Sequence, residues 1–181
     1  MREIRENQIV CRFPRDWPTI KFDDHAFYRN ASNLIQTVKG VDVVAVGEPK
    51  MYLIEIKDYR GSAIENKPKL TTSALIQDVA GKVKDTLAVL YAAHRDGGQD
   101  DLAPLCRHLF GANRRPVDVV LLLEQDGDRK GRQRRDGIAL TTLETRLAAI
   151  LKPFHVHLRV VDCTASNIGG WRAEAMGKVP A

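Results

Sequence analysis

The chain has 181 residues, 44% of them hydrophobic and 28% charged, which is enough apolar material for one well-packed domain spanning 1–181. It has no run of about 18 apolar residues that could span a bilayer, and its polar start, MREIRENQIV, differs from a secretory signal. We therefore expect a cytoplasmic protein. The net charge of +5 is compatible with a polyanionic partner, although many basic proteins bind none.

The cysteines exclude two classes of small protein. Cys11, Cys106 and Cys163 are isolated and odd in number, and no Cys-x-x-Cys pair is present. Neither a disulfide framework nor a zinc ribbon is therefore expected. The three side chains are predicted to be reduced, partly buried thiols.

Hydrophobic periodicity predicts helices alternating with strands. In chain order, we expect a helix over 25–38 capped by Asp23 or Asp24, strands over 41–46 and 51–56 joined by a turn, a helix from Thr71 or Thr72 to about His94, a short helix over 102–110, a strand over 116–125, a helix from Thr141 to Pro153, and a last strand over 155–163. The polar segment 62–70 leaves room for a third short strand. This order predicts an α/β fold with a mixed β-sheet flanked by helices.

The predicted hairpin places charged residues in segments that are otherwise apolar. If its turn is centred between residues 48 and 49, Asp42 lies opposite Glu55 on the neighbouring strand. Like charges in that position are destabilising, so a positive group is expected between them. Side chains alternate along a strand, which puts Lys57 on the same face as Glu55. Two carboxylates at a strand end also suit Mg²⁺. The alternative is an ordinary ion pair of Glu55 and Lys57 on a half-exposed strand.

The segment from Asp24 to Gln125 resembles the PD-(D/E)XK nuclease superfamily, whose core is a helix, a hairpin carrying Asp and then (Asp/Glu)-x-Lys, a helix and a further strand. Asp42 takes the aspartate position, Glu55 the acidic position and Lys57 the lysine position. A valine precedes Asp42 where the family often has proline. The resemblance implies a restriction-endonuclease-like fold with an αβββαβ core and a metal-dependent phosphodiester hydrolase.

The resemblance also implies roles for these residues. Asp42, Glu55 and the main-chain carbonyl of Ile56 would hold Mg²⁺ or Mn²⁺, while Lys57 would position or activate the attacking water. The family often takes a further Gln or Lys from the helix after the Glu-x-Lys strand, and Lys82 is our preferred catalytic or phosphate-contacting residue there. A solvated helix face is the alternative for Lys82.

A basic segment, DGDRKGRQRRDG, is predicted to be a loop between two glycines. Its five basic residues could neutralise phosphates and give salt-sensitive, largely sequence-independent affinity for nucleic acid. These residues are Arg129, Lys130, Arg132, Arg134 and Arg135. The alternative is a solvated loop that binds nothing, which is common for runs of charge.

Together these patterns give the hypothesis of a Mg²⁺-dependent nuclease that acts on nucleic acid, with DNA favoured over RNA. The competing hypothesis is a non-catalytic nucleic-acid-binding or assembly module of a larger DNA-processing or defence system. The sequence shows no obvious targeting domain, so a homodimer or a partner protein that supplies specificity is compatible with either hypothesis.

Overall fold

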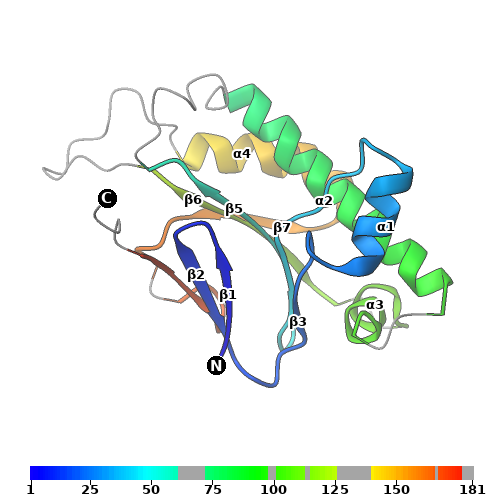
Figure 1. Ribbon diagram of the computed structural model, residues 1–181. Coiled ribbons are helices and arrows are strands. Elements are labelled where there is room, and N and C mark those ends of the chain that lie inside the picture. The colour runs from blue at the N-terminus through cyan, green and yellow to red at the C-terminus, as the bar shows by residue number, and fades with distance from the viewer. Residues whose placement is uncertain (61–71, 98–100, 113–114, 126–139, 166, 177–181) are drawn as a thin grey trace, which may run out of the picture.

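The computed structural model describes residues 1–60, 72–97, 101–112, 115–125, 140–165 and 167–176 (Figure 1). The strands are β1 (Arg2–Glu6), β2 (Ile9–Phe13), β3 (Thr19–Lys21), β4 (Val43–Val46), β5 (Met51–Asp58), β6 (Val117–Glu124), β7 (His157–Val161) and β8 (Arg172–Ala175). The helices are α1 (Ala26–Leu34), α2 (Thr72–Arg95), α3 (Ala103–Phe110) and α4 (Leu140–Leu151), followed by a 3₁₀ turn, Lys152–Phe154. Among these residues, no helix is both long enough and apolar enough to cross a membrane.

The strands form two sheets. The larger one has the order β3-β4-β5-β6-β7, antiparallel from β3 to β5 and parallel from β5 to β7. Parallel neighbours need crossover connections, and helices α2 and α3 lie between β5 and β6 in the chain while α4 lies between β6 and β7. The smaller sheet, β1-β2-β8, is antiparallel. The predicted α/β class with a mixed sheet is therefore confirmed.

The larger sheet has a different cover on each face. Leu53 and Val119 pack into a core with α2 and α3, whereas Ile54 and Ile56 point the other way into a core shared with β1, β2 and β8. Figure 1 shows α2 and α4 on one side of strands β5 to β7 and the β1–β2 hairpin on the other. Within the described residues, helices therefore cover one face of the larger sheet and the smaller sheet covers the other.

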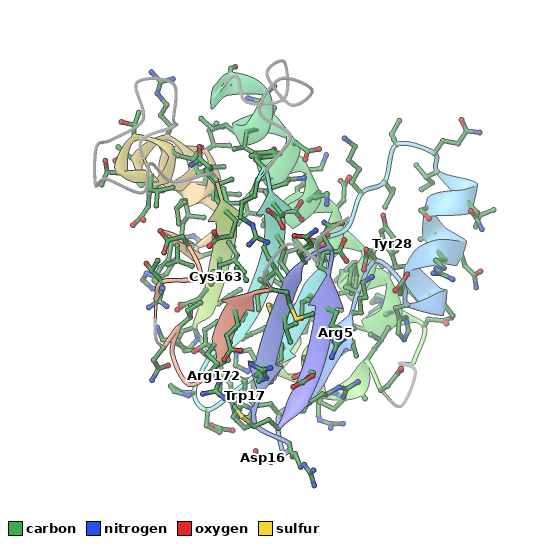
Figure 2. The ribbon with its side chains drawn as sticks, turned by 60° about the vertical axis from the view of Figure 1, so that its left-hand side comes forward. Arg5, Asp16, Trp17, Tyr28, Cys163 and Arg172 are labelled. Atoms are coloured by element: carbon green, nitrogen blue, oxygen red, sulfur yellow. The ribbon has the colours of Figure 1, made fainter. Side chains whose placement is uncertain are left out.

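Aromatic side chains close the core beneath the smaller sheet. Trp171 is almost fully buried and stacks on Phe13 with ring centroids 5.2 Å apart, and Trp17 stacks on Tyr52 at 5.6 Å. Arg172, the first residue of β8, lies with Arg5 of β1 on the exposed side of this sheet (Figure 2). Both tryptophans thus belong to packing. All three cysteines are free thiols, as predicted.

The start of α1 differs from the prediction. His25 is the N-cap residue: its backbone is extended, and its Nδ1 accepts a hydrogen bond from the Phe27 N–H at 3.2 Å. Asp24 instead pairs with two nearby basic side chains, so a carboxylate cap at 23 or 24 is wrong. The helix also ends at Leu34, earlier than predicted.

The strand inventory differs as well. The third antiparallel strand of the larger sheet is β3, which precedes α1, and the segment 62–70 lies outside the described residues. Strand β7 is followed by β8, so the prediction that 155–163 is the last strand is wrong. Thr141 lies inside α4, and the Glu144 carboxylate accepts a hydrogen bond from the Val160 N–H at 3.1 Å. Glu144 thus ties α4 to β7.

Candidate functional site

Hydrogen bonds fix Asp42 and the residue before it. Asp42 directly precedes β4, and its carbonyl oxygen accepts from the Phe22 N–H at 2.9 Å. The N–H of the preceding residue, Val41, donates to Thr86 Oγ1 of α2 at 3.0 Å, and the Ile56 N–H of β5 donates to Asp42 Oδ2 at 2.6 Å. Two main-chain bonds and one side-chain bond therefore set where this carboxylate lies. Thr86 carried no signal that distinguished it from an ordinary core position.

The chain immediately before Asp42 is also held by α1. Tyr28, which comes from α1 (Figure 2), accepts a hydrogen bond at its hydroxyl from the Gly40 N–H at 3.0 Å. A side chain at residue 40 would meet the rings of Phe22 and Tyr28 at 2.9 Å, so only glycine fits this approach. The tight fit fixes the path of the chain into β4.

The hairpin register places Glu55 beside Asp42. Val43 pairs with Ile54 and Val46 with Met51, as expected for a turn centred between residues 48 and 49. Asp42 directly precedes Val43 and Glu55 directly follows Ile54, so this register brings the two residues next to each other. Glu55 is 0% exposed and faces α2, on the same side as Leu53.

Two lysines lie on this pair of carboxylates. Lys57 Nζ is 2.8 Å from Glu55 Oε1, and Lys82 Nζ is 2.7 Å from the same oxygen and 3.5 Å from Asp42 Oδ1. The four residues predicted as catalytic therefore converge, and their catalytic roles remain predictions. Lys82 contacts the carboxylates of the strands rather than lying on a solvated helix face.

Two residues that the sequence analysis missed extend the group. Asp78 Oδ2 is 3.1 Å from Lys57 Nζ, and Asp78 Oδ1 is 2.9 Å from Lys39 Nζ. Asp78 lies four residues before Lys82 on α2 and therefore on the same helix face, which is the signal that could have revealed it. We call these six residues the carboxylate–lysine cluster: Lys39, Asp42, Glu55, Lys57, Asp78 and Lys82.

Burial and mutual repulsion shift the pKa values of the two strand carboxylates. Burial and the nearby Asp42 raise the pKa of Glu55 to about 7, despite the two ammonium groups beside it. Burial also raises the pKa of Asp42, although Lys82 and the Ile56 N–H oppose the shift. The ionised pair is therefore strained in the absence of a further cation.

The two lysines stay charged. Burial alone would lower the pKa of Lys57, but Glu55 and Asp78 outweigh it and raise that pKa. The pKa of Lys82 is likewise raised, because Glu55 and Asp42 outweigh burial. Both side chains are therefore ammonium groups near neutral pH and can donate hydrogen bonds but not accept a proton.

A surface pocket of about 690 Å³ opens over the cluster. Its walls come from the residues before β4, the end of β5 and the first half of α2. They are Lys39, Lys57, Tyr59, Ala74, Leu75, Gln77, Asp78 and Lys82. Asp42 and Glu55 are not among them, so the two carboxylates lie beneath the lysines. The pocket itself presents three ammonium groups and one carboxylate.

Comparison with known proteins gives little beyond this geometry. No family model matches the chain. No solved structure matches it either. Among curated proteins it is similar to a cysteine-tRNA ligase of Neisseria meningitidis, with 27% identity over 150 residues that cover 68% of this chain and 21% of that protein. The chain thus spans about a fifth of the length of this relative, and a similarity of this extent assigns neither family nor activity.

The donor groups of the site suit a hard divalent cation. Within the described ranges, no three His, Cys, Asp or Glu side chains gather as a metal site, so a metal would rest on two carboxylates, water and, as the resemblance implies, the Ile56 carbonyl. Glu55 Oε2 is buried and has no hydrogen-bond partner among the described protein groups, which leaves it able to accept a cation. Asp42 and Glu55 therefore fit Mg²⁺ or Mn²⁺, which would compete with the Lys82 ammonium.

The predicted nucleic-acid-binding residues Arg129, Lys130, Arg132, Arg134 and Arg135 all lie in 126–139, outside the described residues. Their contribution remains a prediction from the sequence.

Proposed function

We propose that this chain is a Mg²⁺-dependent nuclease that hydrolyses phosphodiester bonds of nucleic acid, with DNA favoured over RNA. The observation that carries the proposal is the convergence of Asp42, Glu55 and Lys57 at one end of the β4–β5 hairpin, under a pocket lined with lysines. Two carboxylates and one ammonium group, from β5 and from the residue before β4, meet where the resemblance to PD-(D/E)XK nucleases implies an active site.

The arrangement of elements supports the same proposal. Helix α1 precedes the hairpin, α2 follows it, and β6 then pairs in parallel with β5. On the segment Asp24 to Gln125 this order agrees with the helix, hairpin, helix and strand of the restriction-endonuclease-like core. The third strand of its αβββαβ pattern is not found there among the described residues, and the strand that pairs with β4 is β3, which precedes α1. The additional layer β1-β2-β8 lies on the opposite face from α2 and leaves the pocket side free.

Lys57 would position the attacking water. An ammonium group has three N–H donors, of which Lys57 directs one to Glu55 and one to Asp78. The third is available to a water or a phosphate oxygen in the pocket that Lys57 lines. Because its pKa is raised, Lys57 orients the water by hydrogen bonding and does not take its proton.

Lys82 and Lys39 would balance the charge of the substrate. Both line the pocket together with Lys57, and an ammonium group aimed at a phosphate stabilises the negative charge that develops during displacement. When bound to Asp42 and Glu55, Mg²⁺ would lower the pKa of a coordinated water and offset charge on the phosphate. The two carboxylates would hold the cation near the Lys57 ammonium group, whose N–H donors orient the water.

The proposal predicts metal-dependent cleavage by the purified wild type. Linear, circular and branched DNA and a single-stranded RNA should be tested with Mg²⁺ or Mn²⁺, with EDTA as the metal-free control. We expect cleavage of at least one substrate, abolished by EDTA and by Asp42→Asn, which removes the carboxylate charge at nearly constant shape. Binding without cleavage of any substrate, also after addition of the protein's natural partner, would contradict the proposal.

A specific observation favours a second candidate, a non-catalytic nucleic-acid-binding module. Both strand carboxylates are already paired with lysines and do not line the pocket. A site of this kind presents mainly positive charge, which suits phosphate binding without hydrolysis. The cleavage experiment separates the two candidates, because only the nuclease requires Asp42 as a carboxylate.

The basic loop gives a prediction common to both candidates. Replacing Arg132, Arg134 and Arg135 by glutamine should weaken DNA binding and reduce the slope of log affinity against log salt concentration by roughly 0.9 for each phosphate that is no longer neutralised. Titration of labelled duplex DNA at several salt concentrations measures both quantities. Unchanged affinity and slope would show that this loop is merely solvated.

A further inference from the structure

Asp78 occupies an unusual position between two lysines of the cluster. Each of its carboxylate oxygens takes one of them: Oδ2 is 3.1 Å from Lys57 Nζ and Oδ1 is 2.9 Å from Lys39 Nζ. The side chain of Lys57 is 20% exposed and that of Lys39 is 59% exposed. Asp78 therefore connects the deep lysine of the pocket to the lysine at its rim.

The crowding around Glu55 shows why Lys57 needs this second partner. Lys57 and Lys82 both approach the same oxygen, Glu55 Oε1, at 2.8 and 2.7 Å. Two ammonium groups on one oxygen repel each other. Asp78 offers Lys57 a second acceptor from α2, and a side chain held at two points has a defined direction for its remaining donor.

We propose that Asp78 is a positioning residue for Lys57, which it holds so that the third N–H of the ammonium group faces the pocket. This inference rests on the proposed nuclease function and adds a residue to it. Asp78 acts through Lys57. Its own negative charge lies in a pocket that would receive phosphate and therefore opposes substrate binding. The carboxylate that orients Lys57 thus also weakens the affinity for substrate.

That opposition gives Asp78→Asn a distinctive signature. The amide keeps the size of the side chain, but its NH₂ group cannot accept from an ammonium group, so one of the two lysines is left without its acceptor. We expect kcat to fall about 10- to 100-fold, as displacement of a catalytic group typically does. KM should be unchanged or up to about fivefold lower, because a negative charge near the phosphate is removed. Asp78→Glu should recover part of kcat.

Asp85→Asn is the matched control. Asp85 is also on α2; it accepts a hydrogen bond from the Lys39 N–H at 3.1 Å and forms an ion pair with Lys84. No contact of its side chain with Lys57 is present among the described residues. We expect kcat and KM of this variant to match the wild type. A kcat that falls equally in both variants would mean that the effect is a general one on α2 and would overturn the inference.

A measurement without turnover keeps this test separate from the nuclease proposal. In protein carrying ¹⁵N-labelled lysine, the ammonium signal of Lys57 should be visible at low temperature, since two acceptors protect it from exchange. It should disappear in Asp78→Asn but persist in Asp85→Asn. If the wild type cleaves nothing, the proposed function fails while this spectrum still tests the role of Asp78. A Lys57 signal that persists unchanged in Asp78→Asn, or a wild-type kcat in that variant, overturns the inference itself.

Discussion

Replacing Lys57 by methionine is expected to reduce cleavage by about 10²- to 10³-fold, the usual effect of removing one preorganised donor from an active site. Methionine keeps most of the apolar stem, so the packing around residue 57 is largely retained. Affinity for uncleaved nucleic acid should change only slightly, because Lys39 and Lys82 still line the pocket. Single-turnover cleavage with Mg²⁺ and fluorescence anisotropy in EDTA measure the two effects separately.

Lys84→Met is the control for this experiment. Lys84 lies on α2 and pairs with Asp85, but it does not belong to the cluster, so the same loss of one positive charge should leave the cleavage rate unchanged. Equal reductions of cleavage and binding in Lys57→Met would indicate that Lys57 simply attracts phosphate. Full activity in that variant would remove Lys57 from the mechanism.

Replacing Glu55 by glutamine is expected to change how stability depends on pH. Burial and Asp42 raise the pKa of Glu55 from its ordinary value of 4.5 to about 7 in the folded state. Between these values the folded protein holds a proton that the unfolded chain has released, so the free energy of unfolding falls as pH rises. The wild type should therefore lose about 3 kcal/mol relative to Glu55→Gln between about pH 4.5 and 7. Urea unfolding of both proteins in EDTA at several pH values measures this difference.

Addition of Mg²⁺ or Mn²⁺ extends the same experiment. A cation bound by ionised Glu55 and Asp42 favours the folded state by roughly 2.7 kcal/mol when its concentration is 100 times its dissociation constant. The wild type above pH 7 should therefore be stabilised by metal, and Glu55→Gln much less. Parallel stability curves for the two proteins without metal would show that Glu55 is not strained, and equal stabilisation by metal would place the cation elsewhere.

The parts of the fold that the sequence predicted well are those with long apolar runs. Strand β6 is buried along nearly all of its eight residues, and the stripe of α2 includes the buried residues Ile76, Val79 and Val83. The register of the hairpin followed from the position of its turn. Because that register depends only on the spacing of residues along the chain, the approach of Glu55 to Asp42 could be predicted from the sequence.

Three of the missed strands carry too little hydrophobic pattern to be recognised locally, whereas β2 was missed although four of its five residues are buried. Strand β1 has one buried residue, Ile4, and β8 has one, Ala173. Strand β3 has only three residues. Their pairing depends on partners far away in the chain, which no local window contains. Charged partners were missed for a similar reason, since Asp78 reaches Lys39 and Lys57 only once α2 lies across the sheet.

The smaller sheet imposes an order on folding. Its β2 pairs on one side with the adjacent β1 and on the other with β8, although β2 ends at Phe13 and β8 begins only at Arg172. During synthesis, one edge of the β1–β2 hairpin must stay open until the ribosome has released β8, and Trp171 cannot stack on Phe13 before then. Pairings of such large sequence separation form slowly, and an unpaired strand edge can associate with other chains. The layer β1-β2-β8 is thus complete only once β8 has been made, and until then the open edge of β2 favours association with other chains.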